Sequence, residues 1–262
     1  FARRASGGGL AAVSGYYWPM SRESEPMPPM LHYSHPQADR HLPLAAFALP
    51  DDPLAAGRRV HFHDAVQGYA VGASQSTGAN LLIEDFPWVE LGIVEAGVLT
   101  LEGQGFSLTL AAGDCFVVPR GIALRWRHQG ELRRLFMAFP GLSDSGVMPA
   151  RPLKIDLNLP LQPCDPPAAQ VLLTATPKAW SQTLFASANL RIGLWECEAY
   201  ARKLVEPAYC ELMHIIEGEV TLTPEEGAPC NVRAGETVVV PAGAGNAWTS
   251  LEKVRKVFCI LS

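Results

Sequence analysis

Residues 87–101, PWVELGIVEAGVLTL, align without a gap with residues 208–222, AYCELMHIIEGEVTL. In this alignment Glu90 falls on Glu211 and Gly97 falls on Gly218, at an offset of 121 residues. A glutamate and a glycine that recur at one offset, inside two apolar runs of similar pattern, indicate an internal duplication.

Two later blocks extend the repeat. AAGDCFVVPRGIALRW (111–126) aligns with RAGETVVVPAGAGNAW (233–248), and LRRLFMAF (132–139) aligns with VRKVFCIL (254–261). Trp126 then falls on Trp248, and Arg134 falls on Lys256. The offset is one residue larger in these blocks, which fits a single insertion in the loop before them. A period of this length indicates a duplicated domain, because the units of a solenoid span only about 20–50 residues.

Each copy has the pattern of short strands separated by turns. The run ETVVVPAG (236–243), for example, is β-branched and stops at Pro-Ala-Gly. Proline cannot donate to a β ladder, and glycine opens the turn that follows. Several such strands at regular spacing are typical of a sandwich or a closed barrel. We therefore predict an all-β chain with an N-terminal arm (1–55), a first barrel (56–142), a linker (143–169) and a second barrel (170–262).

The composition bounds the function. Hydrophobic residues make up 48% of the chain and charged residues 18%, which supports a large buried core. The net charge of −5 offers no electrostatic footprint for nucleic acid or an anionic membrane, so we expect neither as a partner. No apolar run is long enough to cross a bilayer, and the opening residues lack a signal-peptide core. We expect a cytoplasmic protein.

The second copy also resembles a known family. The residues that carry the resemblance are Gly193-x-Trp195-Glu196, Glu211, Glu217-Gly218-Glu219, Ala234-Gly235-Glu236, Pro241-Ala242-Gly243, Trp248 and Arg255-Lys256. Together they resemble the (S)-ureidoglycine aminohydrolase-type cupin domain family of the cupin superfamily. The resemblance is good over residues 190–262 and weaker over residues 70–140. It implies two tandem cupin barrels, each a jelly roll, also called a double-stranded β-helix.

The resemblance also bears on metal binding. Metal-binding cupins carry two histidines as His-x-His, then a glutamate, then another histidine after Pro-x-Gly. In the second copy Leu204 and Glu206 stand at the first two positions, before Glu211, and Asn246 stands at the last. Glu206, Glu211 and Asn246 are an all-oxygen set that could hold a divalent cation weakly in the C-terminal barrel. The small number of ligands and their hardness favour the alternative, a polar barrel mouth without metal.

The first copy departs further from this pattern. Ile83, Asp85 and Leu124 stand at the three histidine positions around Glu90. Aliphatic side chains cannot bind a metal, so we expect no transition-metal site in the first barrel.

The mouth of the second barrel is the candidate ligand site. Its candidate ligand-binding residues are aromatic or charged, or carry an amide: Trp195, Lys203, Glu206, Tyr209, Glu211, Asn246, Trp248 and Lys256. Strand alternation places Lys256 on one face with Phe258 and Ile260. We expect Glu211 to pair with Lys256 inside this barrel, and Glu90 with Arg134 in the first, because a buried charge needs a partner.

Two functions remain open. The leading hypothesis is a two-barrel cupin that binds a small polar metabolite in the barrel mouth and has degenerate metal-ligand positions. The alternative, which rests on the resemblance, is a metal-dependent hydrolase or isomerase of a small nitrogenous acid. No catalytic residue is assigned under either hypothesis. We also expect a homodimer, because arms such as residues 1–55 commonly pack on the sheet edge of a neighbouring subunit.

Overall fold

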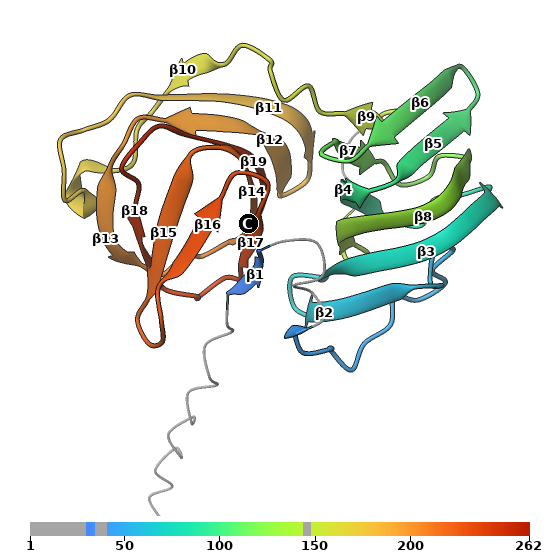
Figure 1. Ribbon diagram of the computed structural model, residues 1–262, viewed down its shortest axis with the longest axis horizontal. Coiled ribbons are helices and arrows are strands. Elements are labelled where there is room, and N and C mark those ends of the chain that lie inside the picture. The colour runs from blue at the N-terminus through green and yellow to red at the C-terminus, as the bar shows by residue number, and fades with distance from the viewer. Residues whose placement is uncertain (1–29, 35–40, 144–147) are drawn as a thin grey trace, which may run out of the picture.

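The computed structural model describes residues 30–34, 41–143 and 148–262. Their regular structure is almost entirely β, and the strands form two jelly-roll barrels that lie side by side (Figure 1). The predicted fold class, all-β with two tandem cupin barrels, is confirmed.

The first barrel is one sheet in which the hydrogen-bonded order is β2-β3-β8-β4-β7-β9, with β5 joining β6 to β8. Its strands are β2 (Arg58–Asp64), β3 (Tyr69–Ile83), β4 (Val89–Ala96), β5 (Val98–Gly103), β6 (Phe106–Ala111), β7 (Cys115–Val118), β8 (Leu124–Phe139) and β9 (Leu153–Lys154). The long strands β3 and β8 pair along most of their length and so run through both layers of the jelly roll.

The second barrel consists of two sheets, with the orders β1-β17-β14-β19-β12-β11-β10 and β13-β18-β15-β16. Its strands are β1 (Leu31–Tyr33), β10 (Gln162–Cys164), β11 (Ala179–Ser187), β12 (Leu190–Cys197), β13 (Ala201–Val205), β14 (Cys210–Glu217), β15 (Glu219–Pro224), β16 (Cys230–Arg233), β17 (Thr237–Val240), β18 (Asn246–Thr249) and β19 (Val254–Leu261). Here the counterparts of β3 and β8 are each broken in two, which separates the layers into distinct sheets.

The two barrels share one strand register. Glu90 on β4 lies opposite Val118 on β7, and Glu211 on β14 lies opposite Val240 on β17. The tryptophans repeat in the same way. Trp126 on β8 lies opposite Leu101 on β5, and Trp248 on β18 lies opposite Leu222 on β15. The prediction that Glu90 and Glu211, and likewise Trp126 and Trp248, occupy equivalent positions is confirmed.

The strands β4 and β14 are apolar on both faces because both faces are buried. Val89, Leu91 and Ile93 of β4 point out of the first barrel into a hydrophobic cluster that also contains Leu212 and Cys259 of the second barrel. The residues between them, Glu90 among them, point into the first barrel. This arrangement accounts for the near-continuous apolar runs from which the repeat was recognised. The barrels are therefore joined by a shared core.

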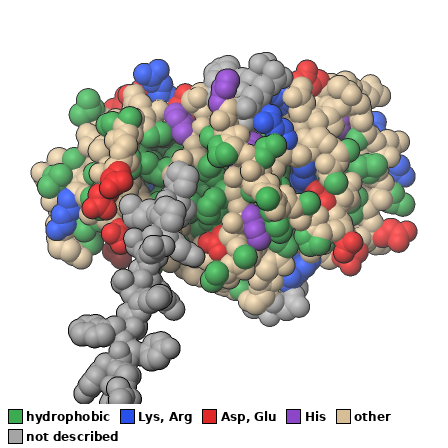
Figure 2. All heavy atoms as spheres, turned by 90° about the horizontal axis from the view of Figure 1, so that it is seen from below, with side chains coloured by type: hydrophobic (Ala, Val, Ile, Leu, Met, Phe, Trp, Pro, Cys, Tyr) green, Lys and Arg blue, Asp and Glu red, His purple; other side chains and the backbone are tan. Residues whose placement is uncertain are grey.

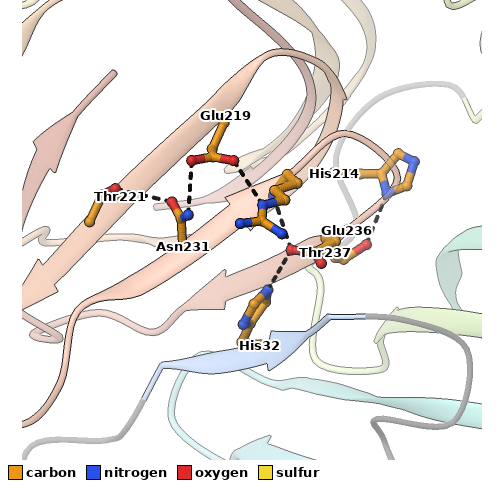
Figure 3. A network of polar contacts seen from close by, with 8 residues as sticks. His32, His214, Glu219, Thr221, Asn231, Glu236 and Thr237 are labelled. Carbon is orange, nitrogen blue, oxygen red and sulfur yellow. Dashed lines mark hydrogen bonds and ion pairs between the residues drawn. The ribbon is translucent and has the colours of Figure 1, made fainter. Parts of the chain in front are cut away.

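The arm contributes a strand to the second barrel of its own chain. β1 pairs antiparallel with β17 at the edge of the larger sheet, and Nε2 of His32 lies within hydrogen-bonding distance of Oε2 of Glu236, at 3.0 Å. Figure 3 shows this contact. Glu236 also accepts a hydrogen bond from the backbone N–H of Arg233, and Nε of Arg233 donates to Glu219. The described strand of the arm thus packs on the sheet edge of its own chain, where we expected a neighbour's. The homodimer stays a prediction, and residues 1–29 and 35–40 of the arm lie outside the described residues.

The segment expected as a linker belongs partly to both barrels. β9 pairs with β7 of the first barrel, and β10 pairs with β11 of the second. Between them, the carbonyl oxygens of Leu157 and Leu159 accept hydrogen bonds from Arg255, at 3.0 and 2.7 Å. Arg255 therefore lies on the outer face of β19, opposite to Lys256, as strand alternation predicted.

Within the described residues, no helix is long and apolar enough to span a bilayer. On the face drawn in Figure 2, the Lys and Arg side chains of the described residues are scattered among Asp and Glu side chains.

Candidate functional site

The interior of the first barrel is filled by a charged cluster. Glu90 is fully buried, and its Oε2 accepts hydrogen bonds from Nη2 of Arg58 at 2.7 Å and from Nε1 of Trp88 at 3.0 Å. Arg134 donates to Oε1 of the same carboxylate. Burial alone would raise the pKa of the Glu90 carboxyl, but the two guanidinium groups outweigh it and hold the pKa below its usual range. The predicted pair between Glu90 and Arg134 is confirmed, and Arg58 is an addition that the sequence did not suggest.

Aromatic rings enclose both guanidinium groups. Cζ of Arg58 lies 4.1 Å from the ring centroid of Phe136, and Cζ of Arg134 lies 4.7 Å from that of Trp126. Nε of Arg58 is also within 2.7 Å of a carboxylate oxygen of Asp52, from the segment before β2. These contacts make the interior of the first barrel a closed and charge-paired core.

This donor set does not suit a metal ion. Both oxygens of Glu90 are bonded by guanidinium groups, which would repel a cation placed there. Asp85, the other oxygen donor at the ligand positions, is exposed on the loop between β3 and β4.

The second barrel holds a cavity of about 750 Å³ at the corresponding place. Six of the eight candidate ligand-binding residues line it: Trp195, Tyr209, Glu211, Asn246, Trp248 and Lys256. The segment before β11 closes one side, with Asp165, Pro167 and residues of the short 3₁₀ helix η2 (Ala169–Val171) among the lining.

At the floor of this cavity Glu211 and Lys256 form an ion pair. Nζ of Lys256 lies 2.8 Å from Oε1 of Glu211 and 3.0 Å from Sδ of Met213. The ammonium also lies 4.8 Å from the ring centroid of Trp195 and 5.2 Å from that of Trp248. The predicted pair is confirmed, and the two indoles stabilise its cation from the sides.

The aromatic wall continues to Tyr200, which the sequence analysis did not single out. Its ring stacks on Trp248, with centroids 5.4 Å apart and planes at 15°, while Trp195 meets Trp248 edge to face at 6.0 Å. Three rings from β12, the β12–β13 connection and β18 therefore form one aromatic wall of the cavity, in which Trp195 stands steeply to the other two rings.

Arg202 is the other residue that the sequence analysis missed. Its Nη2 donates to Oδ1 of Asn246 at 2.8 Å, and its Nη1 donates to the backbone carbonyl of Asn246 at 2.5 Å. Lys203 and Glu206 were predicted instead, yet both are exposed and neither lines the cavity. Lys203 follows Arg202 directly and so points to the opposite face. Glu206 is displaced by an irregularity between Arg202 and Val205 in the pairing of β13 with β18, which puts Val205 on the cavity side with Arg202.

The candidate metal ligands of the second barrel do not converge. Glu206 is exposed, the side-chain oxygen of Asn246 is bonded by Arg202, and Glu211 is bonded by Lys256. A divalent cation placed between these residues would meet a guanidinium and an ammonium. The set therefore does not fit a resident metal. Over residues 30–34, 41–143 and 148–262, no group of three or more His, Cys, Asp or Glu side chains is arranged to hold one.

Comparisons with known proteins agree with this architecture. Residues 185–258 match the family described as the EutQ-like cupin domain. The cupin 2 conserved barrel domain protein from Leptotrichia buccalis is 12% identical, with a TM-score of 0.56 over 78% of this chain and 88% of that one. YlbA from E. coli, of the DUF861 family, is 9% identical, with a TM-score of 0.52 over 83% and 88%. At these identities the likeness shows the fold alone. No curated protein matches the chain.

A nearer relative is a protein of unknown function from Pseudomonas syringae pv. tomato, which belongs to the DUF861 family. It is 31% identical, with a TM-score of 0.80, and the match covers 89% of this chain and all of that one. The chain described here therefore belongs to the DUF861 family, within the cupin superfamily.

Proposed function

We propose that the second barrel binds a small polar metabolite in its cavity. The observation that carries this proposal is the contrast between two equivalent interiors, one filled by its own side chains and the other hollow. The cavity of the second barrel has a volume of about 750 Å³, which lies within the range of about 300–1,000 Å³ that is usual for small-molecule sites. Convergent charges, together with an aromatic wall, are what such sites use to fix and orient a ligand.

The lining favours a polar ligand over an apolar one. It carries the cations Arg191, Arg202 and Lys256 and the anions Asp165 and Glu211. An apolar molecule would bury these groups without giving them new partners, at a cost in free energy. A ligand with its own charged or hydrogen-bonding groups would supply those partners and stack on the indole wall.

The enzymatic alternative has weaker support. A ureidoglycine aminohydrolase-like hydrolase or isomerase that uses a divalent metal would need Glu206, Glu211 and Asn246 as free ligands. Their contacts with solvent, Lys256 and Arg202 weigh against that arrangement. Binding, with or without a later chemical step, is the function that the geometry supports best.

A screen for thermal stabilisation by small amino, guanidino, ureido and carboxylic acids tests the proposal, followed by calorimetric titration of the hits. A ligand at a free concentration of 100 times its Kd should stabilise the protein by about 2.7 kcal/mol. Glu211→Gln and Lys256→Met should weaken binding about tenfold or more, because each removes a charged partner.

Matched controls come from the same barrel. Glu206→Gln and Lys203→Met make the same chemical changes at exposed positions outside the cavity, and should leave the affinity unchanged. If no compound stabilises the protein, or if the two control variants weaken binding as much as the cavity variants, the proposed site is wrong.

A further inference from the structure

The first barrel contains a side chain in the place where the second barrel has a cavity. Arg58 reaches from β2 into the interior, where its guanidinium lies over Phe136 and bonds to Oε2 of Glu90. Its side chain is only 4% exposed. The first barrel therefore shows which chemical group fits against this carboxylate and this ring.

The ring and the carboxylate are both present in the second barrel. Phe136 and Phe258 lie against equivalent glycines, since a Cβ built on either Gly72 or Gly193 would come within 2.9 Å of the ring's Cζ. Phe258 lines the cavity together with Glu211. The two barrels thus offer the same two contacts to whatever occupies the interior.

What the second barrel lacks is the guanidinium. Arg58 lies opposite Ser74 on β3, and the residue in the same register in the second barrel is Ser181, opposite Trp195 on β12. The Ser181 hydroxyl donates to the backbone carbonyl of Leu194 at 3.1 Å and is too short to reach Glu211. The other donor to Oε2 of Glu90, Trp88, aligns with Tyr209, which is 37% exposed. Both donors to that oxygen of Glu90 are therefore replaced.

The charges around the cavity extend this correspondence. Arg58 is held between two carboxylates, Glu90 and Asp52, and the cavity likewise has two, Glu211 and Asp165. Lys256 and a second monovalent cation can share Glu211, because Arg134 and Arg58 share Glu90 in the same way. Arg191 and Arg202 also line the cavity and supply positive charge for an anionic group of the ligand.

We infer that the cavity takes a small guanidino or amidino acid, whose planar cation lies over Phe258 against Glu211 and whose carboxylate lies toward the arginines. This inference rests on the proposed function and names its ligand class. In the first barrel, the guanidinium of Arg58 occupies the position that we assign to the cation of the ligand in the second.

Calorimetric titration with three probes tests the inference: guanidinoacetate, 3-guanidinopropionate and 4-guanidinobutyrate, which differ in the distance between their charges. Each is compared with the ureido acid of the same chain length, in which an uncharged group of the same shape replaces the guanidinium. At least one guanidino acid should bind about tenfold or more tightly than its ureido partner, the value of one charge-assisted contact. In Glu211→Gln this preference should disappear, whereas Glu206→Gln should retain it.

A second variant tests the place of the guanidinium. Ser181→Arg puts into the second barrel the side chain that fills the first, so it should fold and lose guanidino-acid binding. Ser181→Gln adds length without charge, and should weaken binding less. A folded Ser181→Arg variant that binds as the wild type does would overturn the inference. Should this variant not fold, the comparison of guanidino with ureido acids in the wild type and Glu211→Gln decides alone.

The two proposals fail in different ways. If ureido or simple carboxylic acids bind as well as guanidino acids, and Glu211→Gln weakens them equally, the inference on ligand class is wrong and the binding site stands. If no small molecule of any class binds, the proposed function itself is wrong.

Discussion

The two barrels of this chain have the same strand register and opposite interiors. In the first, Arg58, Trp88 and Arg134 converge on the carboxylate of Glu90, and all four side chains are buried. In the second, Lys256 alone bonds the equivalent Glu211 among the described contacts, and the rest of the space is a cavity. The difference shows that a duplicated barrel can become a solid support or a binding site through a few inward-facing residues, because the sheet hydrogen bonds do not depend on them.

The segments that precede each barrel enhance this contrast. Leu49 and Leu54, from the segment before β2, are buried in the interior cluster of the first barrel. The corresponding segment before β11 supplies Asp165 and Pro167 to the cavity wall. One segment therefore closes its barrel with apolar side chains, while the other borders an accessible space.

The largest difference in stability between the two barrels is expected from Glu90→Gln and its matched change in the second barrel. Glu90→Gln removes the anion that Arg58 and Arg134 share and leaves only Asp52 beside Arg58, so it should lower the free energy of unfolding by about 3–5 kcal/mol. Glu211→Gln is the matched change in the hollow barrel and should cost only about 1 kcal/mol, since water in the cavity can solvate Lys256. Urea unfolding followed by circular dichroism measures both. Equal losses would show that the two interiors are equally closed.

An intermediate loss of stability is expected at acidic pH, and it should arise from a histidine of the second barrel. Burial lowers the pKa of His214 from 6.5 to about 4, and the equivalent residue of the first barrel is Ile93, which does not titrate. Between these pH values the unfolded chain binds a proton that the folded chain does not. The free energy of unfolding should therefore fall as the pH drops from 6.5 to 4, by about 3 kcal/mol from this residue.

His214→Ile places the residue of the first barrel at this position and should remove that part of the pH dependence. Stability curves of the variant and the wild type between these pH values check it. Curves that stay parallel throughout would mean that the burial of His214 contributes nothing to acid sensitivity.

The smallest effect is the coupling between the two charges of the cavity. A double-mutant cycle of Glu211→Gln and Lys256→Met, read as free energy of unfolding, should give a coupling of about 1 kcal/mol. The ammonium has Trp195 and Trp248 as further partners, so the pair contributes only part of its stabilisation. A coupling near zero, combined with a strong loss of ligand binding, would assign the pair to ligand recognition. A coupling as large as about 3–5 kcal/mol would mean that the cavity is as dry as the first barrel.

The amino-acid sequence by itself determined the duplication, the β class and the inward side of several strands. Glycines, prolines and tryptophans recur at one offset because turns and barrel closure need them at fixed places, and strict alternation places Lys256 with Phe258 inside. The pairs of Glu90 with Arg134 and of Glu211 with Lys256 followed from the same alternation, together with the cost of an unpaired buried charge.

Only the tertiary structure decided which interior is hollow. Arg58 reaches Glu90 from a different strand, a contact that no local pattern announces. An irregularity in β13 after Arg202 brings Val205 to the cavity and leaves Glu206 outside, since one extra residue reverses the alternation. The pairing of β1 with β17, and the core shared between the barrels, join segments far apart in the chain. Such contacts depend on side-chain reach and on the packing of whole sheets, neither of which a local sequence pattern encodes.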